Sequence, residues 1–139
     1  NLEIGISSQE GELTYFVFDE PALNSFNKEL SLQRVRDTKY NLTKEITVNT
    51  DRLGSILAKY LNNKEIDFMS IDVEGHEMEV LQSNDWDLYR PKYLLVELLN
   101  SDLDSIKEDH IYHFLKKQDY KIYAKTVNTY FFVDCRSNY

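Results

Sequence analysis

Cysteine, glycine and proline are scarce in this chain of 139 residues, which has one, four and two of them. Because Cys135 has no second cysteine to pair with, an internal disulfide and a cysteine-based zinc site are both excluded. No run approaches the roughly 18 consecutive apolar residues of a membrane span, and no secretion signal opens the sequence. We therefore expect a cytoplasmic protein without a membrane span.

Basic residues are also in the minority. With 16 Lys and Arg against 24 Asp and Glu, the formal net charge is -8. This disfavours nucleic-acid binding through a broad basic face and suits neutral or cationic small molecules better. At 139 residues and 42% hydrophobic composition, the chain is long enough for one domain with a core, so we expect residues 1–139 to form a single domain. No initiator methionine precedes Asn1, which points to a fragment of a longer protein.

The pattern of apolar residues predicts strands alternating with helices. Strands are expected at residues 2–7, 12–18, 46–48, 66–73, 93–99, 120–127 and 129–134. Helices are expected at residues 20–37, 50–61, 75–82 and 108–117, the second of them capped by Thr50, with a loop over residues 38–45. The first two strands are predicted to pair as a hairpin, and the last two to form a closing hairpin that turns at Asn128. Such an order is typical of an α/β fold with a mostly parallel sheet and helices on both faces.

Charge is concentrated in the stretch IDVEGHE, where the strand at 66–73 meets the next helix. In open α/β sheets, ligands bind outside the carboxyl ends of the strands. Asp72 and Glu74 are two residues apart and point to the same side if the strand persists, while Gly75 permits a sharp turn and His76 enters the helix. We expect the strands at 66–73 and 93–99 to be adjacent, parallel and buried, which would place Glu97 close to Asp72. Carboxylates gathered in this way raise one another's pKa, bind cations or accept a proton from a hydroxyl.

A purely structural reading of the same residues stays open. The helix dipole favours acidic residues in the first turn, Asp72 could cap the helix, and His76 could be an ordinary polar residue at a helix start.

Several segments together carry a resemblance to a known family. The stretch IDFMSIDVEGHEMEVLQ is followed by RPKYLLVE, preceded by TDRLGSIL and closed by AKTVNTYFFVD. In this arrangement the chain resembles the C-terminal part of FkbM-family methyltransferases, which use S-adenosylmethionine. The resemblance implies a Rossmann-like class I methyltransferase sheet, mostly parallel, with an antiparallel C-terminal hairpin. The family's Gly-rich strand-turn-helix and its second strand ending in an acid have no counterpart here, so N-terminal units of about 60 residues are expected to be missing.

The resemblance also implies a function, namely transfer of a methyl group to a hydroxyl, as in O-methylation of a sugar or polysaccharide precursor. It implies that Asp72 lies at the donor pocket and takes part in proton transfer, with Glu74 and His76 assisting. Glu97 is a candidate for substrate binding and, together with Asp72, for a divalent-cation site.

Weaker candidates for substrate contacts are Asn128 and Thr129 in the terminal turn, and Asn24 and Ser25 near the first helix. Turn formation and helix capping are the alternative roles for all four. The alternative function is a truncated, non-catalytic domain that acts as an interaction or structural module, and we expect the isolated chain to be inactive. An unpaired strand edge at residues 2–7 or 66–73 would favour a homo-oligomer.

Overall fold

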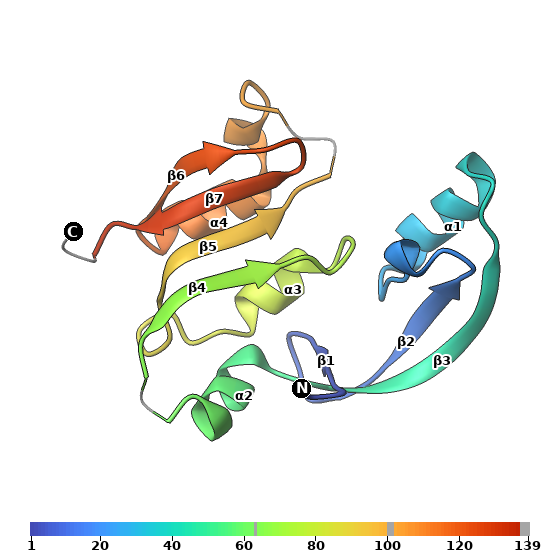
Figure 1. Cartoon of the computed structure of the whole chain (residues 1–139), viewed down its shortest axis with the longest axis horizontal. Coiled ribbons are helices and arrows are strands. Elements are labelled where there is room, and N and C mark those ends of the chain that lie inside the picture. The colour runs from blue at the N-terminus through green and yellow to red at the C-terminus, as the bar shows by residue number, and fades with distance from the viewer. Residues whose placement is uncertain (63, 100–101, 137–139) are drawn as a thin grey trace. The chain divides into compact units, whose positions relative to one another are not determined.

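The computed structural model describes residues 1–62, 64–99 and 102–136. The chain divides into two compact units (Figure 1). Unit 1 comprises Asn1–Ile56 and Val73–Asn84, and unit 2 comprises Leu57–Asp72 and Asp85–Tyr139. No helix in the described part of the chain is long and apolar enough to cross a membrane.

Unit 1 contains a three-stranded sheet in the order β1-β3-β2. The strands are β1 (Gly5–Ile6), β2 (Gly11–Phe18) and β3 (Leu42–Asp51), with β1 parallel and β2 antiparallel to β3. The hairpin predicted between residues 2–7 and 12–18 is therefore wrong, because β3 lies between the two strands.

The length of β3 also departs from the sequence prediction. Residues 38–45 were expected to form a loop, yet β3 already begins at Leu42 and pairs along the whole of β2. The residues Leu42–Glu45 lack the alternating apolar pattern of a strand, so pairing with β2 decides their conformation over their weak local preference.

The region predicted as one helix at residues 20–37 is split in two. A 3-10 turn, η1 (Pro21–Leu23), comes first, and α1 (Lys28–Asp37) begins only after Asn27, whose side chain accepts a hydrogen bond from the N–H of Leu30. This side-chain cap stabilises the start of α1 by satisfying a free backbone N–H.

Two further helices begin near the ends of strands. In α2 (Leu53–Tyr60), the first N–H is bonded to Ser83 Oγ at 2.9 Å, whereas Thr50 lies in β3 and donates to the carbonyl of Gln9. The predicted Thr50 cap is therefore wrong. The helix predicted at 75–82 is α3 (Glu77–Gln82).

Unit 2 contains a four-stranded sheet in the order β4-β5-β7-β6. Its strands are β4 (Ile66–Ile71), β5 (Pro91–Glu97), β6 (Tyr120–Lys125) and β7 (Thr129–Asp134). The strands β4 and β5 are parallel, and β7 lies between β5 and β6, antiparallel to both. This confirms the predicted parallel pair and the closing hairpin.

The core of unit 2 lies on one face of this sheet. Helix α4 (His110–Lys117) follows the short η2 (Ile106–Glu108), and Leu115 of α4 is fully buried. The strand residues Leu94, Tyr130 and Phe132 are fully buried as well. These fully buried side chains belong to the apolar core of unit 2.

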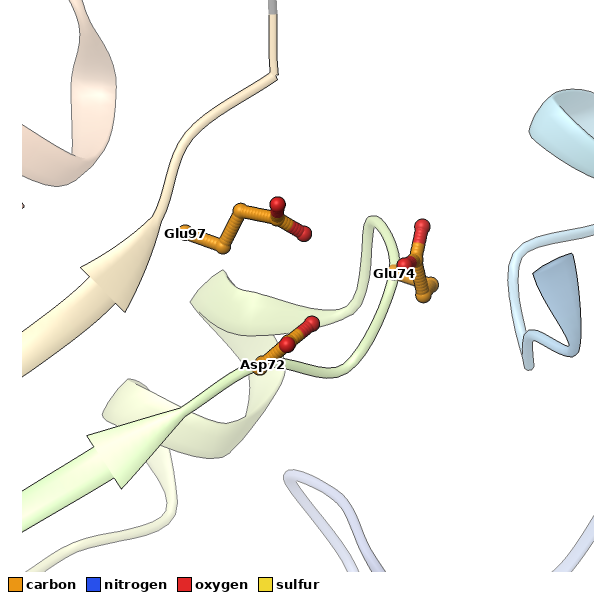
Figure 2. A group of neighbouring side chains, drawn as sticks. All are labelled: Asp72, Glu74 and Glu97. Carbon is orange, nitrogen blue, oxygen red and sulfur yellow. The ribbon is translucent and has the colours of Figure 1, made fainter. Parts of the chain in front are cut away.

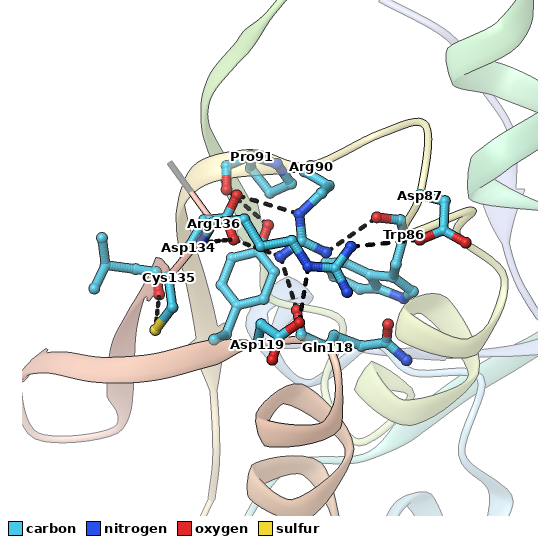
Figure 3. Close-up of polar contacts among 11 residues, drawn as sticks. Trp86, Asp87, Arg90, Pro91, Gln118, Asp119, Asp134, Cys135 and Arg136 are labelled. Atoms are coloured by element: carbon cyan, nitrogen blue, oxygen red, sulfur yellow. Dashed lines mark hydrogen bonds and ion pairs between the residues drawn. The ribbon is translucent and has the colours of Figure 1, made fainter. Parts of the chain in front are cut away.

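An arginine holds one end of this sheet together (Figure 3). Arg90 forms an ion pair with buried Asp134 and donates hydrogen bonds to the carbonyls of Trp86 and Gln118. Its guanidinium also lies 4.9 Å from the centre of the Tyr120 ring. Arg90 therefore links the loop before β5 to the start of β6 and the end of β7.

The expectation of one mostly parallel sheet is not met. The described residues form two mixed sheets, and parallel pairing is found between β1 and β3 and between β4 and β5. The strand β4 was also expected to be buried, but it is a terminal strand and Phe68 is 67% exposed. Both segments predicted to have an unpaired edge, β1 and β4, are terminal strands of their sheets.

Candidate active site

Asp72 and Glu97 lie together at the carboxyl ends of β4 and β5 (Figure 2). Ile71, the last residue of β4, pairs with Val96, so the residues that follow in the two strands lie at the same level of the sheet. A carboxylate oxygen of Asp72 lies within 4.8 Å of one from Glu97. The closeness of these two carboxylates, expected from the sequence, is confirmed.

The pair has two chemical capabilities. Asp72 is exposed, so its carboxylate is accessible to a substrate, and Glu97 is half-buried. Two oxygens at this separation can bind a single hard cation between them, since such cations take carboxylate ligands at about 2.0–2.6 Å. Without a cation, either carboxylate can accept a proton from a hydroxyl.

The chain turns sharply after Asp72, within the stretch IDVEGHE at residues 71–77, which we call the motif. The strand β4 ends at Ile71, and the backbone is left-handed at both Glu74, with φ of 52°, and Gly75, with φ of 87°. The strand predicted to continue to Val73 therefore ends earlier, so the condition under which strand alternation would place Asp72 and Glu74 on the same side is not met.

Glu74 belongs to unit 1, where its carboxylate forms an ion pair with Arg34 of α1. Arg34 is only 8% exposed, and its guanidinium also donates to the carbonyl of Leu23 at 2.8 Å. An ion pair this well buried commits the carboxylate to the guanidinium, because an unpaired buried charge is costly.

His76 is buried in unit 1 beside Ser7. Its Nε2 lies 3.2 Å from Ser7 Oγ, its Nδ1 lies 3.7 Å from a carboxylate oxygen of Glu79, and its ring packs against Phe26. Burial lowers the pKa of His76, and the negative charge of Glu79 partly opposes this shift. Burial of the ring therefore favours the neutral imidazole over the protonated form.

Glu77 stabilises the turn at Glu74 and Gly75 through hydrogen bonds to its backbone. Its carboxylate accepts hydrogen bonds from the N–H of Gly75 at 3.0 Å and of Val73 at 3.4 Å. Burial raises the pKa of Glu77, and the backbone donors partly offset this increase. Sequence analysis did not select Glu77, although an acid two residues after a turn glycine is well placed to accept backbone N–H groups.

Two of the weaker candidates support the fold of unit 1. Asn24 accepts a hydrogen bond from the N–H of Phe18 at 2.8 Å. Ser25 is 1% exposed, donates to the carbonyl of Glu74 at 2.6 Å and accepts from the N–H of Asn27 at 2.9 Å.

The other two weaker candidates lie in unit 2 near Glu97. Thr129 is the strand partner of Glu97 across β5 and β7, and the carbonyl of Asn128 accepts a hydrogen bond from the N–H of Leu98. The side chain of Asn128 is exposed, so this terminal turn places polar groups at the edge that carries Glu97.

Comparison with known proteins gives one match. A family model described as the methyltransferase FkbM domain matches residues 1–122 of the chain. Comparisons with the curated proteins and with the solved structures found no match. The matched region includes Asp72, Glu97 and the turn that joins β4 to α3.

Proposed function

The chain belongs to the FkbM methyltransferase family, and we propose that it serves the transfer of a methyl group from S-adenosylmethionine to a hydroxyl. The observation that carries this proposal is the pair Asp72 and Glu97 at the ends of two parallel strands. This edge of an α/β sheet is where loops commonly form a ligand site.

The proposed reaction is an in-line displacement at the methyl carbon. The acceptor oxygen forms a bond to this carbon, the bond from carbon to the sulfonium sulfur breaks, and neutral S-adenosylhomocysteine leaves. The hydroxyl proton passes to Asp72, which acts as the general base. The protein contributes alignment of the two reactants and removal of this proton.

We propose a sugar hydroxyl, as in a polysaccharide precursor, as the acceptor. The net charge of -8 suits a neutral acceptor better than an anionic one. Glu97 lies near Asp72, and Asn128 and Thr129 lie beside Glu97, so this edge supplies polar groups that can bind the neighbouring hydroxyls of a sugar. The single cysteine agrees with a reducing compartment and supports a cytoplasmic location.

A divalent cation is a further element of the proposal. Asp72 and Glu97 would hold it through their two carboxylate oxygens, and it would supply Lewis-acid chemistry there in place of proton transfer to a free Asp72. Titration with Mg²⁺ or Mn²⁺ tests this. Binding that disappears in both Asp72→Asn and Glu97→Gln supports the site, and binding that survives both substitutions excludes it.

The 139 residues contain four glycines, and none of them forms a Gly-rich turn between a strand and a helix. Such a turn brings backbone N–H groups close to a bound nucleotide. We therefore propose that this chain alone binds S-adenosylmethionine weakly and transfers no methyl group, whereas a chain extended upstream through such a unit does both.

Calorimetric titration of the short and the extended chain with S-adenosylmethionine tests the proposal. We expect measurable heat of binding for the extended chain and weak or undetectable heat for the 139 residues. S-adenosylhomocysteine, which lacks the methyl group and the sulfonium charge, serves as a competing ligand. Tight binding by the short chain, or none by the extended one, would contradict the proposal.

One observation favours a second candidate, a non-catalytic interaction module. The strand β4 is a terminal strand of its sheet, and Phe68 on it is 67% exposed. Exposed apolar edge strands promote pairing with another chain. A homo-oligomer formed through β4 would suit this function and does not require a bound donor.

A further inference from the structure

Three side chains between η1 and the middle of α1 bind the motif turn at Glu74 and Gly75. Ser25 Oγ donates to the carbonyl of Glu74 at 2.6 Å, and Asn27 Nδ2 donates to the carbonyl of Gly75 at 2.9 Å. Arg34 forms the ion pair with the Glu74 carboxylate. All five residues belong to unit 1, so the contacts lie within one compact body.

The turn needs such support because of its backbone conformation. Glu74 is not a glycine, yet its φ of 52° lies in the left-handed region, which costs about 1–2 kcal/mol for an ordinary residue. Residues in this conformation persist where the surrounding contacts fix them. Glu77 adds to the support by accepting the N–H of Gly75.

The packing at Gly75 shows how closely α1 approaches the turn. A Cβ atom at this position would lie 2.9 Å from Leu30 Cδ2 and 3.3 Å from Asn27 Nδ2. A side chain at Gly75 would therefore require the side chains of Leu30 and Asn27 to shift.

The positive charge of Arg34 requires an anion beside it, and the Glu74 carboxylate is that anion. At 8% exposure it is one of the few buried charged residues in the described part of the chain, and Glu74 supplies its counter-charge while Leu23 supplies a carbonyl acceptor. Removing one partner of a buried ion pair leaves the other charge uncompensated. The carboxylate of Glu74 is therefore held as the counter-ion of Arg34.

We propose that Arg34 is a positioning residue of the methyltransferase motif, which fixes the turn at Glu74 and Gly75 and withdraws Glu74 from proton transfer. Glu74 acts as a structural anion, and Asp72 is the carboxylate of the motif that accepts the proton. This assignment of roles rests on the proposed function. The contacts of Ser25, Asn27 and Arg34 with the turn, which we call the clamp, are seen within unit 1 and do not depend on that function.

The clamp is tested first by a double-mutant cycle in the 139-residue chain. Arg34→Met and Glu74→Gln are expected to lower the melting temperature individually, and the double variant is expected to lose less than the sum, because neither charge is then left unpaired. Hydrogen exchange at the amide of Gly75 should accelerate by about tenfold or more in Arg34→Met. Additive losses with unchanged exchange would overturn the clamp.

The role in catalysis is tested in the extended chain by rates of methyl transfer across pH. We expect Glu74→Gln to leave the shape of the pH profile of kcat/KM unchanged, and the double variant to be more active than Arg34→Met alone. Arg34→Lys should be more active than Arg34→Met, because lysine keeps the positive charge. Its activity should stay below that of the wild type, because lysine cannot bond Leu23 and Glu74 in the same forked geometry. A merely structural role for Arg34 would change these rates only in proportion to the loss of folded protein.

The outcomes separate the two proposals. If Glu74→Gln alters the pH profile or reduces kcat as much as Asp72→Asn, Glu74 takes part in proton transfer and the positioning role is wrong, while the proposed function stands. If the wild-type extended chain transfers no methyl group, the proposed function is wrong and the catalytic role of Arg34 falls with it. The double-mutant cycle would still report on the ion pair in that case.

Discussion

Asp72 and Glu97 end neighbouring parallel strands, and their carboxylate oxygens approach within 4.8 Å of each other. This arrangement depends on the register of β4 and β5, in which Ile71 pairs with Val96. A shift of one residue would turn every side chain of β4 to the opposite face of the sheet. The site is therefore determined by strand pairing as well as by the identity of the two acids.

The first prediction concerns Asp72 as the base. In the extended chain, Asp72→Asn should reduce kcat for methyl transfer by about 10²- to 10⁴-fold, the effect expected when a general base is lost. Asp67→Asn is the matched control. Asp67 is an exposed acid on β4, the strand that leads to Asp72, and it forms an ion pair with Lys92. Full activity in Asp72→Asn would exclude a role for this carboxylate in the chemistry.

Part of this site follows from the sequence, and part does not. The apolar runs at 66–71 and 93–97 and the helix between them are enough to predict two adjacent parallel strands. The ion pair of Glu74 joins residues 40 positions apart in sequence, and nothing in the local pattern around Arg34 indicates its partner. Glu74 therefore looked like a free carboxylate in the sequence, although the structure commits it to α1.

The fold, too, was predictable from the sequence only in part. The closing hairpin was predictable because its two strands are close in sequence and flank a turn. The position of β3 was not, because Leu42–Glu45 form a strand only through pairing with β2, more than 20 residues earlier. Local patterns predict strands poorly where a distant partner decides the conformation.

The second prediction concerns the pH dependence of stability through His76. Its pKa lies below the ordinary value of 6.5 because it is buried, so the unfolded chain binds the proton more readily than the folded one. The stabilising contribution is thus fully present above pH 6.5 and is lost as the pH falls through the lower pKa of the folded state. Urea midpoints of wild type and His76→Gln measured between pH 8 and pH 5 should converge as the pH falls.

Glu79→Gln provides the control for this cause. The charge of Glu79 raises the pKa of His76, so its removal should lower that pKa further. The loss of stability should then still begin near pH 6.5, but extend to lower pH and become larger in total. Glu77, whose pKa is raised by burial, acts in the opposite sense, since its contribution is present below pH 4.5 and is lost as the pH rises through its folded pKa. Parallel curves for wild type and His76→Gln would contradict the prediction.

The third prediction compares two glycines with positive φ. Gly75→Ala should destabilise unit 1 by about 1–3 kcal/mol, because alanine is strained at this φ and its Cβ would meet Leu30. Gly11→Ala is also strained, but its Cβ would have no atom within 4 Å. Denaturant unfolding of the two variants should therefore show the larger loss for Gly75→Ala, and equal losses would indicate that α1 adjusts without cost.

The fourth prediction concerns Arg90 in unit 2. Arg90→Lys keeps the charge but cannot maintain the hydrogen bonds to Asp134, Trp86 and Gln118 at once. We expect a loss of about 2–4 kcal/mol in the free energy of unfolding, because Asp134 is buried and would be left poorly paired. The fluorescence of Trp86, the single tryptophan, reports on this region directly.

Arg136→Gln is the matched control for Arg90. Arg136 pairs with Asp119 and Asp87, and all three side chains are substantially exposed to solvent. Exposed ion pairs contribute little, so this variant should unfold nearly as the wild type does. A comparable loss in both variants would show that the burial of Asp134 is not what makes Arg90 important.

The fifth prediction tests the strand edge that favours the interaction module. If copies of the chain associate through β4, light scattering at increasing concentration should show a dimer or larger species. Phe68→Lys should then shift the population toward the monomer, because a charge on an exposed edge strand opposes pairing with another chain. Val127→Lys is the control, since Val127 is 85% exposed and lies in the turn between β6 and β7. A clean monomer of the wild type at high concentration, or equal effects of the two lysines, would contradict association through β4.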